Sequence, residues 1–213
     1  MLPISTGIWL FFEWYNLYLE NWHYINLPPI WWVAMTGSLI SFATVIPGVF
    51  FTSELFQDVL KLDRVKVKPK IFSKGALTAS VVFGAICVTI PLMVPLPYAA
   101  YLFGWVWLGF FFLLDPINYW LKGDSLLGDL TEGKIARALA LLIGGSACGF
   151  LWEFWNFWSY AKWIYDVPII KEIKLFEMPV LGFFGFPPFA LELFAMYASL
   201  KLLRDFIKRA GNR

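Results

Sequence analysis

The sequence has few of the side chains on which soluble enzymes usually depend. Only 15% of its 213 residues are charged, and it holds one histidine, His23, and two cysteines. One histidine is too few for a metal centre built from imidazoles or for a relay between histidines. Cys87 and Cys148 fall within apolar stretches, where a thiol behaves as a small apolar group. We therefore expect no disulfide, no metal site and no cofactor.

Apolar surface, by contrast, is in excess. Hydrophobic residues make up 60% of the chain, aromatic residues 20%, and the mean hydropathy is +0.67. A soluble domain of this length has too little interior to bury so much apolar surface, whereas a bilayer accepts apolar helices of about 20 residues. Because the apolar runs are continuous rather than alternating, we predict an all-α, polytopic membrane helical bundle.

We predict a single transmembrane domain, 1–213, with about six helices. The predicted spans are Leu2–Leu19, Ile30–Phe56, Ala76–Leu96, Ala99–Trp120, Ile135–Trp158 and Phe176–Leu203. Only a Pro-Tyr pair separates the third span from the fourth, so we expect these two to form a tight central hairpin over residues 76–121.

Lysine and arginine are distributed unequally along this topology. In a six-span chain, fourteen of the 17 fall on one side: Lys61, Arg64, Lys66, Lys68, Lys70, Lys74, Lys122, Lys134, Arg137, Lys201, Arg204, Lys208, Arg209 and Arg213. Only Lys162, Lys171 and Lys174 fall on the other. The positive-inside rule then predicts a protein of the inner or plasma membrane with both termini, the loop 57–75 and the tail 204–213 in the cytoplasm. We interpret the basic loop as contacting anionic lipid headgroups and expect no nucleic-acid partner.

Two stretches about 140 residues apart resemble each other, Phe11–Pro28 and Phe150–Pro168. Their alignment pairs Glu13 with Glu153, Asn16 with Asn156, Trp22 with Trp163, Tyr24 with Tyr165 and, farther on, Glu54-Leu55-Phe56 with Glu192-Leu193-Phe194. We interpret residues 1–56 and 135–203 as a parallel internal repeat around the central hairpin. Such repeats often form a binding site where they meet.

Acidic residues occur where a membrane makes them costly. Six lie within or at the edges of the spans: Glu13, Glu54, Asp115, Glu153, Glu177 and Glu192. A charged carboxylate near the bilayer centre costs a few kcal/mol, and no lysine or arginine shares the interior of those spans. Each acid must therefore be protonated, hydrogen-bonded to a neutral partner, wetted, or bound to an imported cation.

Three of the acids have an amide three residues later, which on a helix lies on the same face. The pairs are Glu13 with Asn16, Asp115 with Asn118, and Glu153 with Asn156, and we expect each amide to donate to its carboxylate. The candidate catalytic residues are Glu13, Asn16, Asp115, Asn118, Glu153, Asn156, Glu177 and Glu192. The alternative role for each is to fasten helices together, and for Glu54 and Asp115 a role at a helix end is favoured.

The candidate acids differ in their expected depth in the membrane, and one of them lies beside a stretch of irregular backbone. We expect Glu13, Glu153 and Glu177 in the outer half of the membrane, and Glu54, Asp115 and Glu192 toward the cytoplasmic end. Glu177 heads the run Phe176–Glu192, in which Gly182, Gly185, Pro187 and Pro188 should break or kink the sixth span. Irregular backbone at membrane depth is tolerated where it lines a cavity, so we expect a cavity there.

Three classes of function remain open. Protonated carboxyls in a dry, aromatic-lined cavity can protonate an alkene or epoxide of a lipid-soluble substrate, as in an intramembrane cyclase or isomerase. Acids and broken helices also fit a proton- or cation-coupled carrier, for which six spans are few unless the chain forms a homo-oligomer. The third class is a structural or accessory subunit. Prenyl-diphosphate chemistry ranks lower because paired aspartate motifs are missing near the expected cavity. In each case the partners are the bilayer and a lipid or other hydrophobic small molecule.

The run CGFLWEFWNFW, Cys148–Trp158, resembles the Trp-Glu helices of small integral-membrane terpene cyclases, and the intramembrane acids are similar to those of bacterial lycopene cyclases. That resemblance implies proton-initiated cyclisation with Glu13 or Glu153 as the acid. The Pro-x-Glu-Glu pattern associated with the lycopene cyclases does not occur in the chain. The runs WEFWN and FEMPVLGFFGFPPFALE also resemble those of a family of small bacterial integral membrane proteins, a resemblance that implies no activity.

Overall fold

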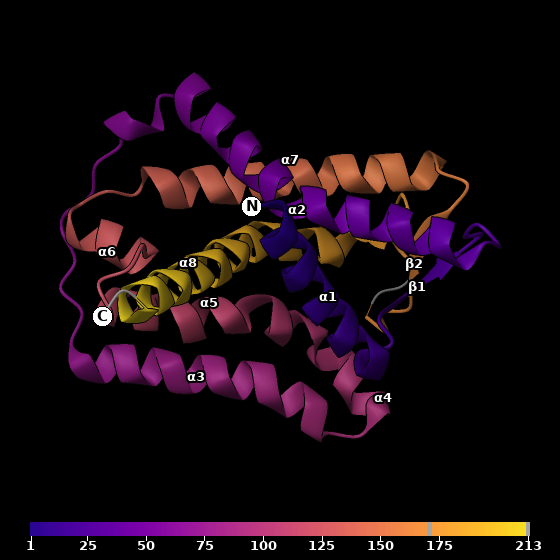
Figure 1. Ribbon diagram of the computed structural model, residues 1–213, viewed down its shortest axis with the longest axis horizontal. Helices are drawn as coiled ribbons and strands as arrows, with labels where there is room; N and C mark the ends of the chain where they lie inside the picture. The colour runs from indigo at the N-terminus through magenta and orange to yellow at the C-terminus, as the bar shows by residue number, and fades with distance from the viewer. Residues whose placement is uncertain (170–171, 212–213) are drawn as a thin grey trace.

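The structure, a computed structural model, describes residues 1–169 and 172–211 (Figure 1). Lys171 and Arg213, which belong to the charge distribution above, lie outside the described residues. The elements in chain order are α1 (Leu2–Leu19), β1 (Trp22–Ile25), α2 (Trp31–Val59), η1 (Leu62–Arg64), α3 (Lys74–Met93), α4 (Leu96–Ala99), η2 (Ala100–Leu102), α5 (Phe103–Trp120), α6 (Leu126–Thr131), α7 (Ala136–Trp158), β2 (Lys162–Tyr165), β3 (Lys174–Leu175), β4 (Met178–Pro179), η3 (Val180–Gly185) and α8 (Phe186–Gly211).

The protein is an all-α helical bundle of the membrane type. Within the described part of the chain, five helical segments are long and apolar enough to cross a membrane, namely Trp31–Val59, Lys74–Met93, Leu96–Trp120, Ala136–Trp158 and Val180–Gly211. The helix α1 has the predicted bounds but is not among the five, because its short stretch also carries polar side chains such as Glu13 and Asn16. By length and composition the count is therefore five, one fewer than predicted.

The central hairpin forms with an earlier turn than predicted. The helix α3 ends at Met93 rather than Leu96, and Val94 is extended, with φ −92° and ψ 150°. Val94 precedes Pro95, and the proline ring disfavours the helical region for the residue before it. The chain then passes through the short α4 and η2 into α5.

The sixth predicted span also begins later than expected. Its first ten residues form the β3–β4 hairpin and the 3₁₀ segment η3, and the α-helix starts only at Phe186. Pro187 and Pro188 therefore lie in the first turn of α8, where a missing N–H has no helical partner to lose. They begin this helix rather than kink it, and the irregular backbone lies before them.

Glycines let the central helices approach closely. A Cβ added to Gly84 of α3 would lie 2.7 Å from the carbonyl oxygen of Gly109 in α5. A Cβ added to Gly145 of α7 would lie 2.7 Å from the carbonyl oxygen of Phe186 in α8. Small residues at such crossings allow backbones to pack in direct contact. The result places α8 between α5 and α7 in the middle of the bundle (Figure 1).

The two ends of the bundle differ in chemistry. The loop after α2, the short α6 and the C-terminal part of α8 lie together at one end, on the left in Figure 1. The described members of the basic set lie in the loop after α2, at the start of α3, in the loops on either side of α6, at the start of α7 and in the second half of α8. The strands β1 and β2 lie at the other end. Main-chain bonds from Val67 to Gly133 and from Lys70 to Leu130 fasten the basic loop to the α6 region. We call these the basic end and the ribbon end.

Replacing Gly84 by leucine should destabilise the fold by about 1–3 kcal/mol, because the new side chain would be forced against the backbone of α5. Thermal unfolding of the detergent-solubilised protein would measure this as a lowered Tm. Gly104→Leu is the matched control, since no heavy atom lies within 4 Å of a Cβ there. Equal melting of Gly84→Leu and the wild type would contradict the close α3–α5 contact.

Candidate functional site

The strands β1 and β2 form a two-stranded antiparallel ribbon that joins the two predicted repeats. In its register Trp22 lies opposite Tyr165, and Tyr24 lies opposite Trp163. The tryptophan of each repeat thus faces the tyrosine of the other, which is the pairing that a local two-fold axis would produce. Side chains two apart on a strand share a face, so these four aromatic residues lie on one face of the ribbon. On the other face, His23 Nδ1 lies 2.5 Å from Asp166 Oδ2, and both side chains are exposed.

Each repeat's glutamate accepts hydrogen bonds from its own strand. Glu153 Oε1 accepts from the Tyr165 hydroxyl at 2.7 Å and from the Trp163 indole at 3.2 Å. Glu13 Oε1 accepts from the Tyr24 hydroxyl at 2.5 Å and from the Trp22 indole at 3.2 Å. The predicted equivalence of Glu13 with Glu153 therefore extends to their surroundings.

The tyrosines remain hydrogen-bond donors over a wide pH range. Burial, with the neighbouring carboxylate of Glu13, raises the pKa of Tyr24, and burial together with Glu153 raises the pKa of Tyr165. Both phenols are therefore protonated near neutral pH. They supply the ribbon with two O–H donors aimed at the two acids.

The two asparagines do not bond the carboxylates as predicted. The Asn156 amide donates to the carbonyl of Trp163 at 2.9 Å, and its Oδ1 accepts from the Trp163 N–H at 3.0 Å. Asn16 makes the same pair of bonds to Trp22, at 2.7 and 3.1 Å. Because each helix ends shortly after its asparagine and the chain turns back, the amide meets the returning strand before it meets the acid. Asn16 and Asn156 thus hold each strand to its own helix.

A cavity of about 560 Å³ lies beneath the ribbon, among α1, α2, α5, α7, η3 and α8. Its walls are mostly aromatic and apolar, and they include Trp9, Trp107, Trp152 and Phe189. The predicted cavity near the irregular start of the sixth span is present, since Gly182 and Gly185 line it. Its volume falls in the range of about 300–1,000 Å³ that is usual for small-molecule sites.

The cavity distinguishes the two glutamates. Glu153 lines it, is fully buried, and has a second oxygen, Oε2, without a hydrogen-bond partner among the described residues. Glu13 is only partly buried and does not line the cavity. Glu13 also has a third donor, the Trp9 indole at 2.8 Å. The position equivalent to Trp9 in the second repeat is Gly149, which has no side chain and lies against the ring of Phe186.

Glu177 has a cationic partner, contrary to the prediction. Its Oε1 lies 3.0 Å from Lys162 Nζ, and the two side chains are 19% and 17% exposed. Lys162 is in β2, outside the apolar stretches in which a counter-charge was sought, and it also donates to the Phe157 carbonyl at 2.7 Å. Glu177 lies in the turn of the β3–β4 hairpin next to Phe176, whose φ of +59° is uncommon for a bulky residue.

Asp115 and Asn118 also act separately rather than as a pair. Asp115 accepts from the N–H groups of Leu126 at 2.8 Å and Leu127 at 2.9 Å, which fastens the start of α6 to α5. Asn118 donates to the Ala195 carbonyl in α8 at 3.0 Å. Asp115 therefore has the helix-end role favoured above. Glu54 is exposed near the end of α2, unlike its repeat partner Glu192.

Glu192 is buried between α8 and α5. It lies in the second turn of α8, nearer the ribbon end than predicted, because that helix starts at Phe186. Its Oε1 accepts from the N–H of Phe110 at 2.9 Å, and its Oε2 has no hydrogen-bond partner among the described residues. Glu192 does not line the cavity.

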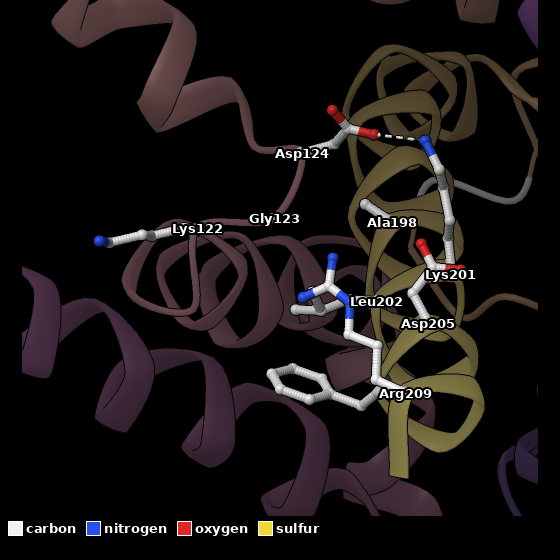
Figure 2. A pocket seen from close by; sticks show the side chains of 9 residues that line it. Lys122, Gly123, Asp124, Ala198, Lys201, Leu202, Asp205 and Arg209 are labelled. Carbon is white, nitrogen blue, oxygen red and sulfur yellow. Dashed lines mark hydrogen bonds and ion pairs between the residues drawn. The ribbon is translucent and has the colours of Figure 1, made fainter. Parts of the chain in front are cut away.

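A smaller pocket of about 200 Å³ lies at the basic end, between the loop after α5 and the last turns of α8 (Figure 2). Its acids are neutralised locally: Lys201 donates to Asp124 at 2.8 Å, which lowers the pKa of Asp124, and Arg204 bonds Asp205. None of the candidate acids lines this pocket. It is a charged surface cleft, separate from the aromatic cavity.

Sequence reasoning missed several residues of the cavity wall. Trp9, Phe42 and Phe189 were hidden among many similar aromatic residues, and nothing in their local pattern separates them from packing residues. For Trp9 a signal did exist, since it lies four residues before Glu13, a spacing that brings two side chains together on a helix.

Comparison with protein-family models, with curated proteins and with solved structures finds no match to this chain. The arguments about function therefore rest on the geometry of the site.

Asn156→Ala should release β2 from the end of α7, because both the donor and the acceptor for Trp163 are removed. The cost of such buried bonds is about 1–3 kcal/mol, and hydrogen exchange of the amides in residues 162–165 should accelerate accordingly. Asn156→Asp is the control, since it keeps the acceptor for the Trp163 N–H. Unchanged exchange in Asn156→Ala would contradict this role.

Proposed function

We propose that the protein is an integral membrane enzyme that performs acid–base chemistry on a lipid-soluble substrate, with Glu153 as the proton donor and acceptor. One observation carries the proposal. Glu153 lines the aromatic cavity, and its Oε2 is buried without a partner among the described residues. A buried polar atom of this kind is costly unless a ligand uses it. Among the described residues such atoms occur in Asn21, Glu153 and Glu192, and of these three residues only Glu153 lines the cavity.

The surroundings of Glu153 suit a proton-transfer group. Tyr165 and Trp163 hold Oε1, so the carboxyl has a fixed orientation and Oε2 is the oxygen without a partner among the described residues. In this proposal a small rotation of the carboxyl brings Oε2 to a bound molecule. When Glu153 gives up its proton, the same two donors stabilise the carboxylate that forms. The aromatic faces around the cavity stabilise positive charge that develops on the substrate.

The proposed reaction needs no reactant other than the substrate. Glu153 Oε2–H protonates an alkene carbon or an epoxide oxygen, which leaves a carboxylate on the enzyme and a cation on the substrate. The cation rearranges or closes a ring, and the carboxylate then removes a proton from a neighbouring carbon. The acid is regenerated, and the product is an isomer of the substrate. This is cyclase or isomerase chemistry, as the resemblance to terpene cyclases implies.

The other candidate residues receive supporting roles in this proposal. Asn156 positions the strand that carries both donors, and Glu177 with Lys162 fastens the hairpin that precedes η3. Asn16 and Glu13 hold the equivalent strand of the first repeat. Asp115, Asn118 and Glu192 fasten α6 and α8 to α5.

Glu153→Gln should abolish conversion of the substrate, by about 10²–10⁴-fold, because the amide keeps the shape of the side chain but cannot transfer a proton. The measurement is a mass-spectrometric comparison of lipid extracts from a host that supplies isoprenoids and other lipids. Glu13→Gln is the matched control, since it alters the equivalent acid outside the cavity and should leave conversion unchanged.

Expression and thermal stability of both variants would be matched to the wild type. Identical extracts from the wild type and Glu153→Gln would contradict the enzyme proposal and favour a carrier, which proton flux in vesicles would then test. Equal loss in both variants would place the function in the ribbon rather than in Glu153.

We propose further that the basic end faces the cytoplasm and that the cavity lies in the outer half of the membrane. The support is the positive-inside rule applied to the basic set. In a background with Cys87 and Cys148 replaced by alanine, a membrane-impermeant maleimide should label Tyr160→Cys in intact cells, and Lys68→Cys only after lysis. Labelling in the reverse order would overturn this orientation.

A further inference from the structure

The wall of the cavity is open along one side. On α2 the lining residues Gly37, Ser41 and Thr44 are exposed, as are Trp155 on α7 and Ser159, which directly follows α7. The α2 residues are spaced four and three apart, so they form one face of the helix. The mouth of the cavity therefore lies between the ribbon-end halves of α2 and α7.

A proline explains why these two helices separate there. Toward the basic end they touch, since a Cβ on Gly144 of α7 would lie 2.8 Å from Ser53 Cα in α2. Toward the ribbon, the α2 residues that line the cavity end at Val45, just before Pro47. Proline removes the hydrogen bond to the carbonyl four residues earlier and bends a helix. Pro47 therefore lies between the part of α2 that touches α7 at Ser53 and the part, residues 33–45, that lines the cavity.

The opening faces hydrocarbon rather than water. Both α2 and α7 are among the five helices long and apolar enough to cross a membrane, and the exposed side chains beside the mouth include Trp155, 57% exposed. A molecule that passes between two such helices comes from the bilayer. Water-soluble ligands have no corresponding route through this side.

The positions of Glu153 on α7 and Val45 on α2 indicate how a molecule bound in the cavity is oriented. Glu153 lies five residues before the end of α7, which is about 8 Å at 1.5 Å per residue. Val45 lies fourteen residues into α2, about 21 Å from its start. The acid is therefore near the ribbon end of the cavity, and an apolar chamber continues below it. Lys162 and Ser159 line the ribbon-end rim, where a polar group can lie.

We infer that the gap between α2 and α7 is a lateral portal through which a chain-bearing membrane amphiphile enters. The polar end of this molecule lies at the rim by the ribbon, the group that meets Glu153 lies close to that end, and the hydrocarbon chain fills the deeper chamber. The assignment of a reacting group rests on the proposed function, whereas entry of the chain does not.

The test uses the full-length protein reconstituted in phosphatidylcholine vesicles that contain a phosphatidylcholine with a photoactivatable diazirine on one acyl chain. After illumination, mass spectrometry locates the lipid adducts. Adducts on Glu153 and on Phe189, which is 1% exposed, are expected because only a chain inside the cavity can reach them. Absence of adducts at these buried residues, with normal labelling of lipid-facing residues, would overturn the portal.

Gly37→Trp should block the portal. A Cβ at Gly37 meets no heavy atom within 4 Å, so a large side chain fits the fold and occupies the mouth. Adducts at Glu153 and Phe189 should fall to background in this variant. Gly7→Trp is the matched control, because Gly7 of α1 is equally open but does not line the cavity. Ser41→Trp provides a second block if Gly37→Trp folds poorly.

The outcomes separate the portal from the reaction. Adducts that persist in both Gly37→Trp and Ser41→Trp would show that the chain enters elsewhere. Adducts in the wild type, together with unchanged lipids in Glu153→Gln cells, would support the portal and contradict the enzyme proposal. Loss of conversion in Glu153→Gln, without any adduct in the cavity of the wild type, would support the enzyme proposal and contradict the portal.

Discussion

A carboxyl group among apolar helices must be met by hydrogen-bond donors, and this requirement organises the ribbon end of the molecule. The donors come from a strand that turns back over each helix and places a tyrosine and a tryptophan on its acid. An asparagine one turn after each acid fastens that strand. Because the two strands also pair with each other, both acids, both repeats and the roof of the cavity form one connected network.

Within this network one difference in sequence gives the two acids different numbers of donors. Trp9 gives Glu13 a third donor from one turn earlier on the same helix, and it bonds the same oxygen, Oε1, that Tyr24 and Trp22 bond. At the equivalent place the second repeat has Gly149, and Phe186 packs against its bare backbone. The glycine thereby brings α8 close to α7 and places Phe186, which lines the cavity, against α7.

Much of this architecture is predictable from sequence, because it depends on strong local signals. Continuous apolar runs predict the helices, and the repeat alignment predicts that Glu13 and Glu153 have equivalent partners. The predictions fail where a partner comes from outside the helix. Spacing pairs Asn156 with Glu153, but the returning strand competes for the amide. The lack of lysine and arginine inside the spans predicts no cationic partner for the acids, but Lys162 reaches Glu177 from β2. Glu192 is predicted toward the cytoplasmic end but lies nearer the ribbon end, because Pro187 and Pro188 begin α8 instead of interrupting it.

The contrast between Glu153 and Glu192 shows what separates a site from a packing residue in such a protein. Both are fully buried, and each has one oxygen without a partner among the described residues. Glu192 lies between α5 and α8, its Oε1 fastens the two helices, and it does not line the cavity. Glu153 lines the cavity, which extends along α2 as far as Val45. Burial alone gives both acids the same desolvation cost, and in the proposed function the neighbouring cavity is what gives Glu153, rather than Glu192, a substrate.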